Sequence, residues 1–329
     1  MSVRQYLSTV IDGMAKGLFA SLIVGVIIRQ IGVMTNITLL ANIGQAAQFM
    51  MGPSIGVGIA FARQAKLFTL LSAMAAGALG AGSISAAGSI VVGEPMGACI
   101  AALAAIEAGK RLEGRSKFDL LIIPGLVILI GGLVGAFVSP VISAFMRQIG
   151  FWVNEMTMLH PLPMGILLAV VVGIILTLPI SSAALCISIH IGGIAAGAAL
   201  AGCCAQMVGF AVSSFRENKW SGLISQGIGT SMIQMPNIIK NPWIWLPPTM
   251  AAAVTGPLAT MVFYMETTSV GAGMGTSGLV GQFTTFGVMG PASVTPMLLL
   301  HFVIPAVISF VVSEWMRRKG LICFGDMKL

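Results

Sequence analysis

Charged residues are scarce in this chain. Asp, Glu, Lys and Arg make up 8% of its 329 residues, whereas hydrophobic residues make up 57%. An ordinary soluble domain carries about 25% charged residues, because its surface must face water. So few charges could not cover a water-facing surface, and the shortage therefore excludes such a domain. The composition therefore predicts an all-α protein that crosses a membrane many times.

Acids, histidines and paired cysteines are also few. The net charge of +7 comes from 17 basic residues against 10 acids. In a membrane protein such an excess sets orientation, so it does not predict nucleic-acid binding. The five cysteines show no C-x-x-C spacing, and four lie in apolar stretches, as buried reduced thiols do. The three histidines have no carboxylate or thiolate at ligand spacing, so we expect no metal and no cofactor.

Apolar runs of spanning length are abundant. A spanning helix needs about 20 apolar residues. Two further stretches, 220–241 and 268–288, are rich in Gly, Ser, Thr and amides but nearly lack charge. Irregular backbone at membrane depth must be buried in protein or line a cavity, so we expect re-entrant or broken helices there, with 80–92 as a further candidate. Together with the broken stretches, the clear candidates predict about ten spans. The clear candidates are 14–33, 44–62, 67–83, 90–109, 119–143, 163–180, 188–213, 243–264 and 291–315.

The two halves of the chain resemble each other. GLFASLIVGVII (17–28) aligns with GILLAVVVGIIL (165–176), and Arg63 and Lys66 align with Arg216 and Lys219. Chance similarity between apolar, Gly-rich helices is the alternative. The distribution of basic residues, with clusters at 110–117 and 317–319, fits two inverted repeats, 1–156 and 157–329, within one membrane domain and with both termini in the cytoplasm. Inverted repeats place a substrate site near the membrane midplane, as in transporters.

A glycine-rich stretch, GAGMGTSGLVGQ (271–282), contains a formal G-x-G-x-x-G pattern at Gly273, Gly275 and Gly278. A dinucleotide site also needs a preceding strand, a following helix and an acid about 20 residues on. No such acid follows, because the next one after Glu266 is Glu314. We expect the glycines to shape a solute cavity instead, where close backbone approach is easy. The candidate binding side chains there are Thr276, Ser277 and Gln282.

Ionisable residues inside apolar stretches are candidates by default, because they are costly in a membrane. Glu94 is the most isolated acid, and Glu266 adjoins the glycine-rich stretch. Alternatively, Glu94 caps a half-helix and Glu266 lies at a water-facing helix end. A lone histidine within a span, such as His190 or His301, is more often hydrogen-bonded structure than a site. His160 is a stronger candidate, because it lies just before a span and the prolines that follow it, Pro161 and Pro163, fix the backbone.

An amide-rich loop, SMIQMPNIIKNPWIW (231–245), carries the remaining candidates. Gln234, Asn237 and Asn241 supply donors and acceptors, and Pro236 and Pro242 break the helix there. Trp243 and Trp245 can stack on the apolar face of a sugar or belong to an interfacial aromatic belt. We expect the solute to bind between 231–241 and 273–282, with Glu94 and His160 close by.

Three segments resemble a known family. LTLPISSAALCISI (176–189), NPWIWLPPTMAAAVTGPLATMVF (241–263) and GAGMGTSGLVGQ (271–282) resemble the membrane subunit IIC of the bacterial phosphotransferase system, in the PfoR-like subgroup named as toxin regulators. The resemblance implies a homodimer in the bacterial cytoplasmic membrane and a sugar or similar solute. It also implies sugar-binding roles for Glu266 or Glu94 and for His160, although the acidic motif of sugar-transporting members is not clearly present.

Two functions follow as hypotheses. The first is a permease that binds and translocates a small polar solute by alternating access. Coupled phosphorylation would then need separate IIA and IIB proteins, because we expect neither domain in this chain. The second is a membrane sensor or regulator that binds a ligand without transporting it. Besides the solute, the expected partners are membrane lipid, a second copy of the chain and a IIB protein.

Overall fold

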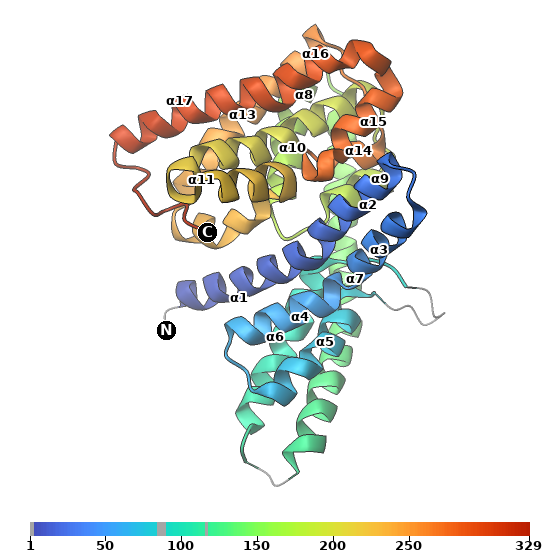
Figure 1. The fold of residues 1–329 in the computed structure, drawn as a ribbon, viewed down its shortest axis with the longest axis vertical. Coiled ribbons are helices and arrows are strands. Elements are labelled where there is room, and N and C mark those ends of the chain that lie inside the picture. Colours follow the sequence, from blue (N-terminus) through green and yellow to red (C-terminus); the bar gives the residue numbers. More distant parts are fainter. Residues whose placement is uncertain (1–2, 84–89, 116–117) are drawn as a thin grey trace. The chain divides into compact units, whose positions relative to one another are not determined.

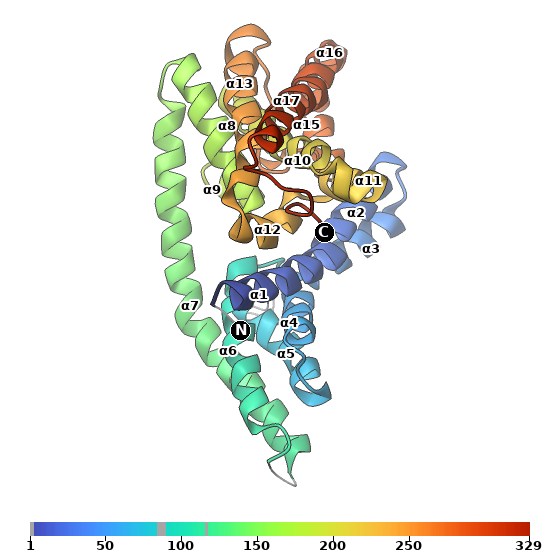
Figure 2. The ribbon, with the colours of Figure 1, turned by 90° about the vertical axis from the view of Figure 1, so that its left-hand side faces the viewer.

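The computed structural model describes residues 3–83, 90–115 and 118–329. Within them the chain is helical, with no β-strand and one isolated bridge between Gly193 and Thr267. The chain forms two compact units, Met1–Phe145 (unit 1) and Met146–Leu329 (unit 2). The division falls inside α7 (Asp119–Thr157), a long uninterrupted helix (Figures 1 and 2). The fold-class prediction is confirmed: this is an all-α polytopic membrane protein.

Unit 1 is built from regular α-helices, with one π-helical segment, η1, between the first two. Its first helix, η1 and α2 follow one another without a break, and Figure 1 shows α3 folding back beside α2. Next in order, α1 packs on α4, α4 on α5, and α5 on α6. The elements are α1 (Val3–Leu18), the π-helix η1 (Phe19–Ile23), α2 (Val24–Met34), α3 (Thr38–Phe49), α4 (Met51–Ala62), α5 (Leu67–Ala81), α6 (Pro95–Leu112) and the first part of α7.

Glycines bring the helices of unit 1 into backbone contact. A Cβ on Gly13 of α1 would lie 2.5 Å from the carbonyl oxygen of Gly58 in α4. A Cβ on Gly56 of α4 would lie 2.0 Å from the carbonyl oxygen of Ala73 in α5. Small residues at such crossings maximise van der Waals contact, which drives helix association where lipid removes the hydrophobic driving force.

Unit 2 alternates regular helices with short irregular ones. Its helices α8 and α13 pack on each other and on α10, and α17 packs on α10 and α13. The elements are the end of α7, α8 (Pro161–Thr177), α9 (Ser182–Ser188), α10 (Gly193–Ser213), α11 (Phe215–Ile224), η2 (Ser225–Gly229), η3 (Ser231–Gln234), α12 (Met235–Lys240), η4 (Pro242–Trp245), α13 (Leu246–Pro257), η5 (Leu258–Val262), α14 (Ser269–Ala272), η6 (Ser277–Leu279), α15 (Val280–Met289), η7 (Gly290–Ser293), α16 (Val294–Met297), η8 (Leu298–Val303) and α17 (Ile304–Arg318).

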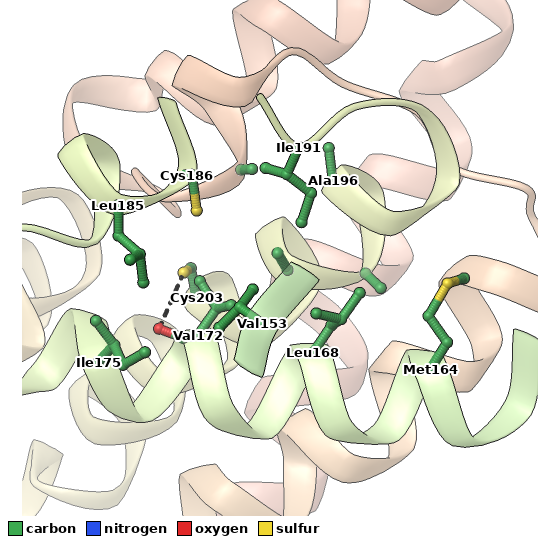
Figure 3. Close-up of a cluster of buried hydrophobic side chains, with 13 residues drawn as sticks. Val153, Met164, Leu168, Val172, Ile175, Leu185, Cys186, Ile191, Ala196 and Cys203 are labelled. Atoms are coloured by element: carbon green, nitrogen blue, oxygen red, sulfur yellow. Dashed lines mark hydrogen bonds between the residues drawn. The ribbon is translucent and has the colours of Figure 1, made fainter. Parts of the chain in front are cut away.

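Helix α10 is the buried centre of unit 2. Almost every residue from Ala196 to Ser213 is buried. Beside it, α8 and α9 contribute Leu168, Val172 and Leu185 to an apolar cluster, which Figure 3 shows around the Cys203 thiol. That thiol donates to the carbonyl oxygen of Val172 at 3.7 Å. A helix enclosed this completely can position polar groups on several faces without exposing them to lipid.

The two polar stretches are broken helices, as predicted. In 220–241, α11 runs into a π-helix (η2), an extended residue at Thr230, a 3₁₀ turn and the short α12. In 268–288, the four-residue α14 is followed by turns, η6 and α15. The third candidate stretch, 80–92, includes residues 84–89, which lie outside the described residues.

Four helices in the described residues are long and apolar enough to span a membrane: Gln5–Met34, Asp119–Thr157, Gly193–Ser213 and Ser277–Arg318. Shorter apolar helices occur at Met51–Ala62, Leu67–Ala81 and Pro161–Thr177. The number of ten spans and the inverted repeats remain predictions. The span expected at 119–143 is longer than predicted, because α7 continues to Thr157 with Pro140 inside the helix.

Candidate functional site

The glycine-rich stretch 271–282 forms an irregular turn between α14 and α15. Gly275 and Gly278 have φ angles of +57° and +53°, and Leu279 follows at +58°. Residues with a side chain seldom adopt this region, and such local strain clusters at functional sites. The stretch therefore has the backbone that its glycines predict, although no dinucleotide-type strand precedes it.

The glycines let this turn lie directly on two helices. A Cβ on Gly273 would lie 2.5 Å from the carbonyl oxygen of Ser182 in α9, and one on Gly275 would lie 2.9 Å from Met207 Sδ in α10. The Ser182 hydroxyl donates to the Gly273 carbonyl oxygen at 2.7 Å. The small residues at these two positions are thus required for packing of the protein on itself.

Three buried polar atoms on this turn and on η8 have no hydrogen-bond partner within the described part of the chain. They are Ser277 Oγ, Gln282 Oε1 and His301 Nε2. Ser277 is 3% exposed and His301 is 0% exposed. A buried polar group without a partner costs about 1–3 kcal/mol, so each of these atoms has a strong tendency to bind a ligand or water.

Two of these three residues are hydrogen-bonded to each other. Gln282 Nε2 lies 3.1 Å from His301 Nδ1, and it also donates to Cys204 Sγ at 3.4 Å. The contact joins α15, the π-helix η8 and α10. π-Helical turns are frequent at functional sites, because they redirect side chains within an otherwise regular helix. We call Ser277, Gln282 and His301 the partnerless cluster.

Sequence reasoning selects Ser277 and Gln282 but misses His301. The histidine that it selects, His160, is exposed and immediately precedes α8. The rule that an ionisable group in an apolar stretch is a functional candidate applies to both histidines. What distinguishes His301 from His160 is its contact with Gln282, which the three-dimensional structure shows.

Thr276 has a different environment from its neighbour Ser277. It is fully buried, and its hydroxyl donates to Met207 Sδ at 3.4 Å. A thioether sulfur is a weak acceptor, so this hydroxyl is only weakly satisfied. Thr276 thus remains a candidate beside the partnerless cluster.

The predicted amide residues bind another part of the chain, residues 321–329. Gln234 and Asn237 donate to the carbonyl oxygens of Met327 and Lys328, each at 2.9 Å. Asn241 donates to the Leu321 carbonyl oxygen at 3.0 Å and to the Asp326 carboxylate at 2.7 Å. We call residues 321–329 the strap. The amide donors that were expected to face a solute are occupied by the strap.

A ladder of side chains continues from these amides into unit 2. Asn237 donates to Gln234 Oε1 at 2.9 Å, and Gln234 donates to Gln226 Oε1 at 2.9 Å. Gln226 in turn donates to the Ser214 hydroxyl at 2.8 Å. Each amide in the ladder has partners on both sides, so the ladder fixes η2, η3 and α12 against the end of α10.

A buried ion pair stands beside the ladder. Arg317 Nη2 donates to both carboxylate oxygens of Glu217, at 2.9 and 3.1 Å, and to the Ser213 carbonyl oxygen at 3.0 Å. The side chains of Arg317 and Glu217 are 9% and 0% exposed. The backbone N–H of Gly325, in the strap, also donates to Glu217 at 3.4 Å.

The two predicted carboxylates occupy unlike positions. Glu94, in unit 1, immediately precedes Pro95 and α6; its backbone N–H donates to the Ala81 carbonyl oxygen at 2.9 Å. Its side chain makes no capping hydrogen bond to α6, so the capping alternative is wrong. Glu266 is exposed, in the irregular segment between η5 and α14, and its backbone N–H lies 3.1 Å from Met289 Sδ.

The two broken stretches do meet, through η2 and η6, which pack against each other. This contact brings Ser225–Gly229 beside Ser277–Leu279. It brings the segment that carries Gln226 of the ladder beside the segment that carries Ser277 of the partnerless cluster. The amide residues and the partnerless cluster thus belong to neighbouring but separate polar networks.

A further polar network on α10 was not predicted. Gln206 is fully buried; its Oε1 accepts from Trp245 Nε1 at 3.1 Å, and its Nε2 donates to the Thr249 hydroxyl at 3.1 Å. Trp245 is therefore engaged inside unit 2. A lone glutamine within an apolar run was the sequence signal for this network.

A comparison with known protein families gives one match that covers nearly the whole chain. The family described as "Phosphotransferase system, EIIC" matches residues 8–329. Comparisons with curated proteins and with solved structures give no match. The family match agrees with the resemblance of the three segments and with the apolar, all-helical fold. The chain belongs to the phosphotransferase system EIIC family and is a membrane component of that system.

Proposed function

We propose that this protein binds a sugar or similar small polar solute in unit 2 and translocates it by alternating access. One observation carries the proposal. Ser277, Gln282 and His301 each present a buried hydrogen-bonding atom that has no partner among the described residues. A solute with hydroxyl groups would satisfy these atoms and compensate for the cost of burying them.

The unpaired atoms of unit 1 make a less convincing site. Gln48 Nε2 and Thr69 Oγ1 are also buried without a partner in the described residues. They lie singly on α3 and α5, whereas Gln282 and His301 are joined by a hydrogen bond. A ligand gains more from groups that are already held in place, because less side-chain entropy is lost on binding.

Similar helix neighbourhoods in the two units support the alternating-access part of the proposal. In unit 1, α4 packs on α1, α5 and α6; in unit 2, α10 packs on α8, α13 and α17. The corresponding pairs within the remaining helices, α5 with α6 and α13 with α17, also pack on each other. In many transporters that are built from two repeats, one repeat moves against the other during transport.

The proposal places the protein in the bacterial cytoplasmic membrane as a homodimer that works with a separate phosphate-carrying IIB protein. Close approach of small residues on helix surfaces is compatible with dimerisation. The residues predicted from the sequence, Glu94, His160, Glu266 and Thr276, remain candidates for the path of the solute. In this proposal Gln234, Asn237 and Asn241 influence the path of the solute indirectly, because they bind the strap.

Exchange of radiolabelled sugars and polyols across proteoliposomes tests the proposal. We expect the full-length protein to exchange at least one of them, and Gln282→Leu to abolish the exchange. Gln48→Leu is the matched control, because it removes a partly buried amide from unit 1 and should leave exchange intact. Absence of exchange with every compound would contradict translocation. Binding without exchange would instead favour the sensor or regulator, the function suggested by the PfoR-like subgroup.

A further inference from the structure

The strap is bound by the broken stretch 220–241 and by a residue just before it. Asn218, in α11, donates to the Met327 carbonyl oxygen at 2.7 Å and accepts from the Leu329 backbone N–H at 2.9 Å. These two bonds add to the ones that the strap accepts from the amides of η3, α12 and the residue after α12. The strap therefore connects several short elements that are separate along the chain.

The bonds to the strap lie close to interruptions of the helical backbone. Lys219, with φ +52° and ψ −145°, directly follows Asn218. Thr230 is extended, with φ −160° and ψ 146°, and precedes η3, which carries Gln234. Asn241 is itself the extended residue between α12 and η4. Positions at the ends of elements absorb the backbone rotations of hinge movements, so the strap bridges three potential hinges.

The strap is attached through its main chain and few of its own side chains. Ile322 and Met327 are buried, at 2% and 0% exposed, whereas Phe324 is 78% exposed. Gly320 and Gly325, with φ angles of +71° and +98°, turn the chain before the strap and within it. Segments with few buried apolar contacts detach at a lower free energy than the whole protein unfolds. The strap can therefore leave the stretch 220–241 while unit 2 stays folded.

The stretch that the strap holds lies beside the partnerless cluster. Its π-helix η2 packs against η6, which carries Ser277. Ser277 is 3% exposed and His301 is 0% exposed. A solute reaches atoms that are buried this completely only when neighbouring segments move, as loops and lids do over many binding sites. The stretch 220–241, with its interrupted backbone, is such a neighbouring segment.

We propose that the strap restrains the movement of the stretch 220–241 and thereby slows the exchange of solute. The proposal rests on the proposed function, in which the solute binds at the partnerless cluster. The bonds to the strap are present in the closed conformation and break when the stretch moves. Removing them raises the free energy of the closed conformation but not that of the transition state, so exchange becomes faster. Equilibrium affinity stays the same, because these bonds form with or without solute.

Two substitutions weaken the restraint in different ways. Asn218→Ala removes two hydrogen bonds to the strap. Met327→Asp places a carboxylate where the side chain is 0% exposed, so the strap must detach to hydrate the charge. Phe324→Asp is the matched control, because it places the same carboxylate on a strap residue that is 78% exposed.

Hydrogen–deuterium exchange of the full-length protein in detergent measures the restraint without any solute. We expect the backbone amides of 220–241 to exchange about five- to ten-fold faster in Asn218→Ala, since two hydrogen bonds are lost. They should exchange faster still in Met327→Asp and at the wild-type rate in Phe324→Asp. Wild-type amide exchange in both Asn218→Ala and Met327→Asp would overturn the proposal, whatever the protein transports.

Exchange of radiolabelled sugars across proteoliposomes measures the effect on function. We expect Asn218→Ala to exchange sugar about five-fold faster per folded protein, with unchanged equilibrium affinity. A purely structural strap would instead give slower sugar exchange and a lower unfolding midpoint, and this result would overturn the proposal. Faster amide exchange with an unchanged sugar rate would overturn the restraint on solute alone. Absence of sugar exchange in the wild type and in every variant would overturn the proposed function and the restraint with it.

Discussion

The interiors of the two units differ in chemistry although both are helical. The buried polar residues of unit 1, within its described part, all carry hydroxyl groups: Ser8, Ser21, Thr69, Ser72 and Ser83. Unit 2 buries hydroxyl groups as well, and it also buries four amides and one imidazole, which belong to Gln206, Gln226, Gln234, Asn237 and His301. A hydroxyl in a helix can bond to the preceding turn, as Ser72 does to the Phe68 carbonyl oxygen at 2.7 Å. The Thr69 hydroxyl is an exception, because it has no partner in the described residues. An amide needs partners from other segments.

This difference indicates which unit can determine specificity for a solute. Groups that are satisfied within their own helix can be buried without constraining the fold. Groups that need distant partners fix several segments at once, and they also provide the atoms that recognise a solute. Unit 1 therefore has the interior of a scaffold, and unit 2 has the interior of a binding unit.

The largest expected effect comes from comparing one ion pair of each unit, Arg317–Glu217 in unit 2 and Arg63–Glu107 in unit 1. Arg317→Leu leaves the buried Glu217 charge unpaired in unit 2, and such a loss costs about 3–5 kcal/mol. Arg63→Leu breaks the pair with Glu107 in unit 1, whose side chains are 15% and 30% exposed, and removes the stacking on Tyr6 at 4.3 Å. We expect about 1–2 kcal/mol there. Denaturant unfolding in detergent measures both, and equal losses would contradict the contrast.

Helix packing should not distinguish the units. A Cβ on Gly56 in unit 1 or on Gly202 in unit 2 would lie 2.0 or 1.9 Å from a carbonyl oxygen of the facing helix. We expect Gly56→Ala and Gly202→Ala each to destabilise by about 1–3 kcal/mol, because the helices must separate. Gly125→Ala is the control, since nothing lies within 4 Å of its Cβ. A loss in only one unit would show that the units pack differently.

Much of the fold could be predicted from the sequence, because composition and apolar run length respond to the membrane alone. Glycines, prolines and amides marked the broken stretches correctly, since they disfavour a lipid-facing helix. The continuation of α7 through Pro140 could not be predicted, because neighbouring groups in a membrane protein can compensate for a proline. The choice of His301 over His160 needed its position beside Gln282, and no pattern along the chain gives that.

The strap was not predictable for a different reason. Gln234, Asn237 and Asn241 recognise main-chain carbonyl oxygens of residues 321–328, together with the Asp326 carboxylate. Every residue has such an oxygen, so a carbonyl partner leaves almost no trace in sequence. The amide residues indicated that polar groups lie opposite them, but they did not indicate whether those groups belong to a solute or to the chain itself.

The next prediction concerns that choice. Asn237→Ala removes two hydrogen bonds and should loosen the strap, with a loss of about 1–3 kcal/mol. Cys323, on the strap, is exposed while the other four cysteines are buried, so a spin label can be attached there selectively. We expect the label to become more mobile in Asn237→Ala but not in the control Ser225→Ala, whose hydroxyl bonds only within its own helix at 3.4 Å. A solute role for Asn237 would instead lower ligand affinity and leave the spectrum unchanged.

The smallest effect on stability should come from Ser277→Ala, and it sharpens the contrast between structural and recognition groups inside unit 2. The Ser277 hydroxyl has no partner in the described residues, whereas the equally buried Ser293 donates to the Gly290 carbonyl oxygen at 2.7 Å. Removing an unsatisfied hydroxyl relieves a desolvation cost, so Ser277→Ala should change the free energy of unfolding by less than about 0.5 kcal/mol or stabilise slightly.

Removing the satisfied hydroxyl in Ser293→Ala should cost about 1 kcal/mol. Ligand binding should rank the two variants in the opposite order. Ser277→Ala should weaken the binding of a neutral sugar about five- to ten-fold, because the ligand loses a buried partner, and Ser293→Ala should leave it unchanged. Unfolding midpoints and equilibrium binding on the same preparations give both rankings. If Ser277→Ala lost stability and kept its ligand, the hydroxyl would be structural, and the partnerless cluster would be reduced to Gln282 and His301.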